Sequence, residues 1–115
     1  ATREDYALAA AKVLLDPSLQ GVTHELAGDD SFTLAQMAEA VSVQIGDTVS
    51  YVNMSVPDLT AAYHQAGMPE DMAGFLAMTD VEVSNGALFD DRRVLSKIIG
   101  RATTPMKDTV AKALA

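Results

Sequence analysis

Two histidines and a neighbouring tyrosine are the side chains of this sequence that could bind a metal or move a proton. His24 and His64 are its only histidines, and cysteine is absent. No third ligand stands at a spacing that would complete a metal site with them. Tyr63 precedes His64, but no lysine follows one helical turn later to assist proton delivery. No catalytic triad or acid–base pair can be assembled, so the sequence predicts no catalytic residue and no metal site.

Two acidic segments are better explained by structure than by chemistry. The triplet at residues 29–31 (Asp-Asp-Ser) is similar to the attachment site of acyl carrier proteins, but residues 32–34 fit a turn into a capped helix. Predicted strands on either side also do not belong in a four-helix carrier. We interpret the triplet as a turn. A second acidic stretch is expected to be a solvated face, and it contains Asp80, Glu82, Asp90 and Asp91.

Composition restricts the class of protein. The chain has 115 residues, of which 49% are hydrophobic and 21% charged, so it should fold around one core. The net charge of −8 makes nucleic-acid binding improbable, and no apolar run is long enough to span a membrane. The N-terminus lacks the layout of a signal peptide, and the lack of cysteine fits a reducing compartment. We therefore expect a cytoplasmic protein.

Hydrophobic periodicity predicts about six helices. Residues 3–15 form an apolar helix with Thr2 and Asp5 spaced as a capping box, and residues 33–46 form an amphipathic helix between Thr33 and Gly46. The remaining helices are expected at residues 55–65, around residues 72–76, at residues 94–100, and from Thr104-Pro105, where the threonine hydroxyl should cap the last helix.

Alternating patterns predict two short strands, at residues 22–27 and 48–54. Two isolated strands are barely stable without a neighbour, so we expect a sheet edge from outside this chain to pair with them and to cover the apolar first helix.

Several motifs, in order and spacing, resemble the NAD(P)H:quinone oxidoreductase branch of the NmrA-like family, a group of atypical short-chain dehydrogenases/reductases. They are found at residues 5–11 (DYALAAA), 23–30 (THELAGDD), 32–36 (FTLAQ), 48–53 (TVSYVN), 67–70 (GMPE), 86–91 (GALFDD) and 95–104 (LSKIIGRATT). The resemblance covers essentially all 115 residues, but only the C-terminal part of the family's longer chain.

This resemblance implies an α/β fold in which residues 1–115 are the helix-rich C-terminal, substrate-binding lobe of a Rossmann-type protein. The N-terminal half that binds NADPH is missing, because no Gly-rich phosphate loop occurs in this sequence. The family's cleft is lined from this lobe, which places Arg3 beside the cofactor. The apolar residues expected nearest a quinone are Phe75, Leu76, Met78, Leu88 and Phe89. The alternative for each of these five residues is ordinary core packing, and for Arg3 it is a solvated residue at the start of the helix.

Three functions remain open at this stage. The chain is expected to be the substrate side of an NADPH-dependent quinone reductase and inactive alone, because the nicotinamide carries the chemistry. The alternatives are a lobe of an NAD(P)-sensing regulator of the NmrA type, or a standalone interaction module that docks through exposed strand edges and the apolar first helix. A homo-oligomer is also considered, and oligomerisation in solution would favour the interaction module. The sequence does not specify the acceptor or the choice between NADPH and NADH.

Overall fold

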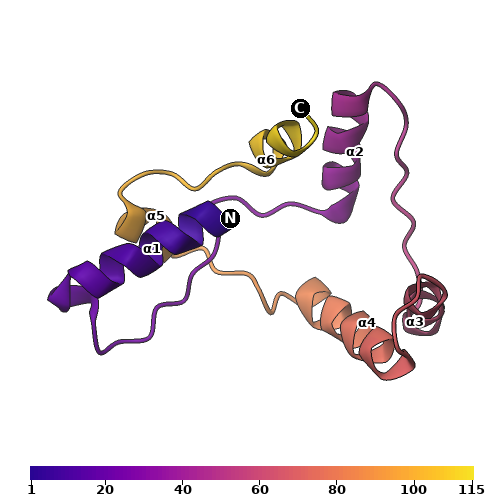
Figure 1. The fold of residues 1–115 in the computed structure, drawn as a ribbon, viewed down its shortest axis with the longest axis horizontal. Helices are drawn as coiled ribbons and strands as arrows, with labels where there is room; N and C mark the ends of the chain where they lie inside the picture. The colour runs from indigo at the N-terminus through magenta and orange to yellow at the C-terminus, as the bar shows by residue number, and fades with distance from the viewer. The chain divides into compact units, whose positions relative to one another are not determined.

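The computed structural model describes residues 1–115, which divide into two compact units (Figure 1). The first unit joins Ala1–Tyr51 to Asp90–Ala115, and the second is Val52–Phe89. The first unit contains α1 (Arg3–Leu15), a 3₁₀ turn (Pro17–Leu19), α2 (Leu34–Ile45), α5 (Val94–Ile99) and α6 (Met106–Ala113). The second contains α3 (Val56–Gln65) and α4 (Glu70–Ser84). The six predicted helices are confirmed.

Side-chain caps begin the first two helices, as the sequence predicts. The Thr2 hydroxyl accepts the Asp5 N–H at 3.1 Å, and the Asp5 carboxylate accepts the Thr2 N–H at 3.1 Å. Thr33 and Gln36 form the same reciprocal pair at the start of α2. At its end Gly46 has a φ of 72°, a conformation that residues with a side chain adopt at a cost. The capping boxes and the glycine stop are therefore confirmed.

The first unit has a small core where α1 packs against α5. Ala9 and Leu95 are fully buried, Ile99 is nearly so, and Leu8 and Leu26 lie partly buried against them. In the same unit α2 packs against α6 with no fully buried residue in either helix. The core is therefore concentrated at the α1–α5 contact.

The second unit is a helical hairpin made by α3 and α4. Ala73 and Ala77 are its buried residues, and such small side chains let two helices approach closely. The helix α4 continues to Ser84, further than the sequence pattern predicts, and Asn85 and Gly86 then turn the chain. The expectation of one core is wrong, because each unit has its own buried residues.

The two predicted strands are also wrong, and with them the α/β class for this chain alone. Residues 22–27 and 48–54 are irregular, and no β-ladder occurs anywhere in residues 1–115. A β-strand is defined by main-chain hydrogen bonds to a neighbouring strand. Neither segment has a neighbouring strand in this chain. Alternating hydrophobicity therefore marked segments that lack a partner here.

The expected cap of the last helix is wrong as well. Pro105 is the capping residue of α6 and makes no side-chain cap hydrogen bond. The Thr104 hydroxyl instead donates to the Asp5 carboxylate at 3.3 Å. Because α6 begins at Met106, Thr104 lies one residue before the capping position, and its hydroxyl bonds to Asp5 outside the helix.

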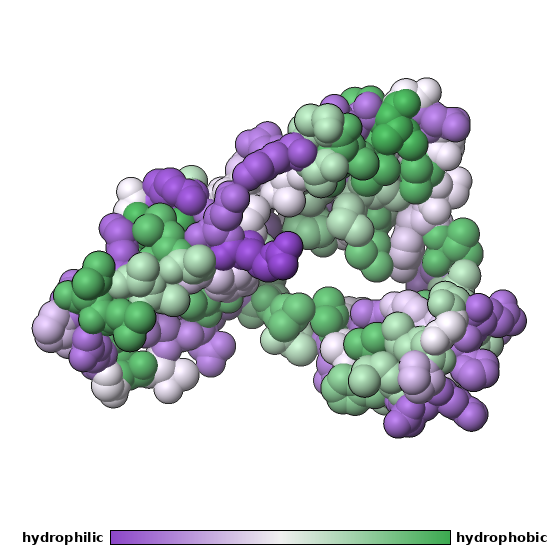
Figure 2. All heavy atoms as spheres, in the orientation of Figure 1, coloured by the Kyte–Doolittle hydropathy of each residue, from purple (hydrophilic) through white to green (hydrophobic).

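Many large hydrophobic side chains of both units are exposed, and Figure 2 shows hydrophobic surface over α2 and over the hairpin. Leu14 and Leu15, at the end of α1, are 78% and 83% exposed. The cover that α1 was predicted to need on several sides is thus not supplied within residues 1–115.

No helix of the structure is long and apolar enough to cross a membrane.

Candidate functional site

The outward face of α4 carries two of the predicted substrate residues. Phe75 is 66% exposed and Met78 52% exposed. The opposite face of the same helix holds Ala73 and Ala77, which are buried in the hairpin. Leu76 lies between the two faces and is half-buried. The helix is therefore apolar on two sides, and only one of them is covered within the hairpin.

The other two predicted substrate residues follow α4 directly. Gly86 has a φ of 92°, and its carbonyl accepts the Phe89 N–H at 2.9 Å, which closes the turn after the helix. Leu88 and Phe89 are 73% and 65% exposed. All five predicted residues therefore belong to the same unit, on one helix and the turn that ends it. Their contact with a quinone stays a prediction.

A tyrosine and an aspartate join the two helices of the hairpin. The Tyr63 hydroxyl donates to the Asp80 carboxylate at 3.0 Å. This hydrogen bond and partial burial raise the pKa of Tyr63 above its usual value. The shift moves ionisation of the phenol further from neutral pH, and we assign this pair to packing.

The two histidines each contact a main-chain carbonyl. His24 Nε2 lies 2.7 Å from the Leu19 oxygen, and His64 Nδ1 lies 3.1 Å from the Met68 oxygen. His64 is exposed on α3, whereas the strand expected at residues 22–27, which would carry His24, is absent. No group of three potential metal ligands gathers in the structure.

The predicted acidic stretch is divided between the two units. Glu82 and Asp91 are exposed, as expected of a solvated face, and Asp80 bonds to the tyrosine described above. Asp90 forms an ion pair with Arg92, which lowers the pKa of Asp90. The stretch is therefore not a single site.

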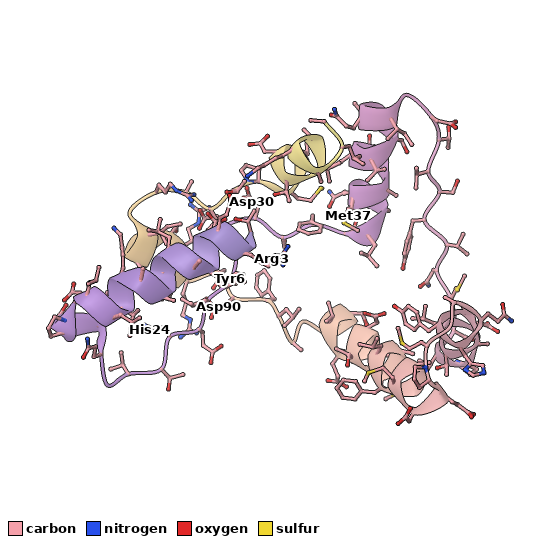
Figure 3. All side chains as sticks on the ribbon, in the orientation of Figure 1. Arg3, Tyr6, His24, Asp30, Met37 and Asp90 are labelled. Carbon is pink, nitrogen blue, oxygen red and sulfur yellow. The ribbon has the colours of Figure 1, made fainter.

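Arg3, the predicted cofactor-side residue, is the first residue of α1 and is exposed (Figure 3). Two positions later Asp5 is fully buried, with 0% exposure. Its carboxylate accepts the Thr104 N–H at 3.0 Å and pairs with Arg101 at 2.7 Å, in addition to the capping bond with Thr2. Burial by itself raises the pKa of Asp5, but these donors outweigh burial and hold it well below its usual range.

A second aspartate holds the same C-terminal segment. The Asp29 N–H donates to the Thr103 hydroxyl at 2.8 Å, and the Thr103 N–H donates to the Asp29 carboxylate at 2.9 Å. The pKa of Asp29 is lowered chiefly by that Thr103 N–H and also by the Ser96 hydroxyl. The Asp29 Oδ1 atom has no hydrogen-bond partner, and the Ser96 hydroxyl donates to the Arg93 carbonyl at 3.2 Å. A hydroxyl can rotate between such acceptors, so we regard Asp29 as satisfied.

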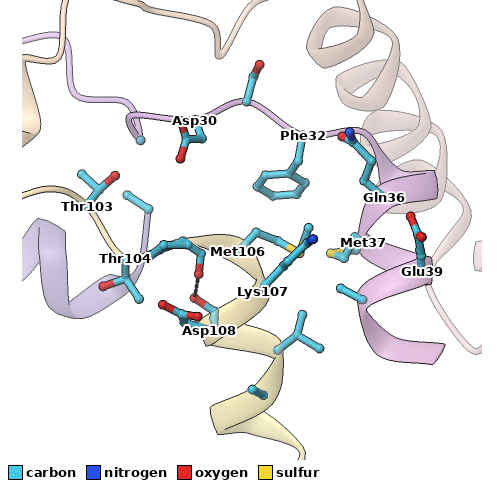
Figure 4. A pocket seen from close by; sticks show the side chains of 18 of the residues that line it. Asp30, Phe32, Gln36, Met37, Glu39, Thr103, Thr104, Met106, Lys107 and Asp108 are labelled. Carbon is cyan, nitrogen blue, oxygen red and sulfur yellow. Dashed lines mark hydrogen bonds between the residues drawn. The ribbon is translucent and has the colours of Figure 1, made fainter. Parts of the chain in front are cut away.

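A groove between α2 and α6 was not predicted from the sequence. It encloses about 720 Å³, and Phe32, Met37 and Met106 point toward one another across it (Figure 4). Asp30, from the triplet interpreted as a turn, and Lys107, on α6, also line the groove. The only signal in the sequence is that α2 and α6 each carry an apolar stripe, which does not say that the two stripes meet.

Comparison with known proteins identifies relatives for nearly the whole chain. Over 111 residues the chain is 45% identical to quinone oxidoreductase 2 of Escherichia coli. The matched region covers 96% of this chain and 39% of that protein. The chain is a homologue of that protein. The resemblance to NmrA-like quinone oxidoreductases is thereby confirmed, although no protein-family model matches the chain.

Solved structures agree with this homology. Two crystal structures of the NADPH-dependent quinone oxidoreductase of E. coli, one complexed with NADPH, match all of this chain with a TM-score of 0.94 and 43% identity. The triphenylmethane reductase of Citrobacter sp. matches 99% of it with a TM-score of 0.89 and 31% identity. The chain spans about two fifths of the length of these homologues.

Proposed function

We propose that the protein to which this chain belongs transfers hydride from NADPH to a quinone or a similar electron-poor acceptor. The 45% identity with E. coli quinone oxidoreductase 2 across 96% of the chain supports this proposal. In such a reaction the nicotinamide supplies the hydride, and the protein supplies position and an apolar cleft. The absence of a catalytic pair in these residues is compatible with that division.

We assign the chain to the substrate side of the cleft. The exposed side chains of Phe75, Met78, Leu88 and Phe89 offer an apolar surface with aromatic rings and a flexible thioether, which suits a flat apolar ring. Leu76, which is half-buried, would support this surface from behind.

The contribution of this chain to NADPH binding is small. Exposed Arg3 offers a guanidinium for an anionic group of the cofactor, such as a phosphate. No Gly-rich phosphate loop is present in residues 1–115, so most of the binding must come from elsewhere in the protein. We accordingly expect the chain to be inactive by itself. A cytoplasmic location and homo-oligomerisation stay predictions.

The direct test is an assay of the intact protein with NADPH and a panel of quinones. Replacing Phe75 and Met78 together by serine should raise the KM for the quinone several-fold and leave the KM for NADPH unchanged, because only the acceptor contacts this surface. Gln65→Ala, at an exposed position of α3 in the same hairpin, is the matched control and should change neither constant.

The outcomes separate the alternatives. NADPH binding without turnover on any acceptor would contradict the proposal and favour an NAD(P)-sensing regulator. Turnover by the 115-residue chain alone would contradict its assignment as one side of a cleft.

A further inference from the structure

The start of α1 is held more firmly than helix capping requires. A capping box needs only the reciprocal bonds between Thr2 and Asp5. In the second capping box of the chain, at the start of α2, Thr33 and Gln36 are both exposed. Here Asp5 is 0% exposed, and its carboxylate also accepts the Thr104 N–H at 3.0 Å and pairs with Arg101 at 2.7 Å. One side chain thus joins the first turn of α1 to a segment about one hundred residues away.

The segment that receives Asp5 is itself anchored from the other side. Thr103 exchanges two main-chain to side-chain hydrogen bonds with Asp29, at 2.8 and 2.9 Å. Thr103 is buried, with 7% exposure. The segment that contains Thr104, the partner of Asp5, is therefore held in place within the first unit by Asp29.

Arg3 has the opposite character. It lies in the same helical turn and is exposed, and it makes no hydrogen bond or ion pair in the structure. Its neighbour Glu4 is occupied by an ion pair with Lys112 at 3.0 Å. The turn therefore presents one unpaired guanidinium on an anchored backbone.

We infer that Asp5 is a positioning residue: its buried carboxylate fixes the first turn of α1, and thereby the place from which Arg3 reaches an anionic group of the cofactor. This inference rests on the cofactor-side role of Arg3 in the proposed function. Fixing a binding residue before the ligand arrives reduces the ordering cost of binding, so loosening the turn weakens the contact even though Asp5 itself does not touch the cofactor.

The test is a double-mutant cycle in the intact protein, with the Kd for NADPH measured by fluorescence titration apart from any turnover. Arg3→Gln should weaken NADPH binding about tenfold, the size expected for losing one charge-assisted contact. Asp5→Asn should also weaken it about tenfold, and the double variant should be no weaker than about tenfold, because both changes remove the same contact. Glu4→Gln, in the same turn, is the matched control and should leave the Kd unchanged.

A second pair of variants guards against misfolding of the Asp5 variant. When Arg101 is replaced, the buried Asp5 carboxylate still accepts the N–H groups of Thr2 and Thr104, so Arg101→Leu should fold. It should weaken NADPH binding, and Arg101→Lys should restore most of it. The KM for the quinone should not change in any of these variants.

Each result decides between the hypotheses. A lower melting temperature for Asp5→Asn with an unchanged Kd would make Asp5 purely structural and overturn the inference. An unchanged Kd for Arg3→Gln would remove Arg3 from the cofactor site and overturn the inference with it. Neither result bears on quinone reduction, which fails only if the intact protein binds NADPH without turnover.

Discussion

Asp5 and Thr104 are 99 positions apart in the sequence and are joined by two hydrogen bonds, from the Thr104 N–H at 3.0 Å and from its hydroxyl at 3.3 Å. Arg101 adds an ion pair to the same carboxylate. The first helix of the chain and the segment before its last helix are therefore tied through one buried charge.

Removing the carboxylate should destabilise the first unit strongly. Asp5→Ala leaves the N–H groups of Thr2 and Thr104 without their acceptor, and a donor left unsatisfied in this way costs about 1–3 kcal/mol. Arg101 is 48% exposed and can turn to water, so it adds little to this cost. Lys112→Ala should cost less than about 1 kcal/mol, because the Lys112–Glu4 pair is 75% and 74% exposed. Urea unfolding of both variants measures the difference, and equal losses would refute the special role of Asp5.

Acid should weaken the fold progressively. The pKa values of Asp5 and Asp29 are both lowered in the folded state, so the unfolded chain binds protons more readily than the folded chain. Their stabilisation is fully present above the ordinary carboxyl pKa of about 4 and is lost as the pH falls below it. Melting temperatures between neutral pH and about pH 3 should therefore fall with the pH, and should fall less steeply for Asp5→Asn. Parallel curves for the two proteins would contradict this assignment.

The two faces of α4 should respond differently to substitution. Ala77 is 1% exposed at the contact with α3, so Ala77→Leu should overpack the hairpin and cost about 1–3 kcal/mol. Phe75→Ser alters a side chain that is 66% exposed and should change the stability of the isolated chain by no more than about 0.5 kcal/mol. Thermal unfolding followed by circular dichroism measures both. A large loss for Phe75→Ser would mean that this face packs within the chain.

Two threonines that both precede helices should act through different partners. Thr33→Ala removes the cap of α2 and should cost about 1 kcal/mol. Thr104→Val removes a hydrogen bond to Asp5 and no cap of α6, so its cost should largely disappear in an Asp5→Asn background. Denaturation of the single and double variants tests this coupling, and strict additivity would contradict it.

Helix positions were predictable because their signals are local. Thr2 with Asp5, Thr33 with Gln36, and Gly46 each act within one helical turn, and the structure confirms them. Strand prediction at residues 22–27 and 48–54 failed because pairing depends on a neighbour that an alternating pattern cannot supply. The sequence pattern underestimated the length of α4 because this helix has apolar residues on two faces, which weakens the 3.6-residue repeat by which an amphipathic helix is recognised.

The sequence by itself determined which segments are helices, which side chains cap the first two of them, and which family the chain resembles, because each of these is encoded in residues close together along the chain. Only the tertiary structure decided that Thr104 serves Asp5 and not α6, that Asp29 holds Thr103, and that α2 and α6 enclose a groove. These contacts join residues far apart in the sequence. Local sequence patterns do not show that the carboxylates of Asp5 and Asp29 meet the segment at residues 103–104, and this meeting determines the hydrogen-bond partners of Thr103 and Thr104.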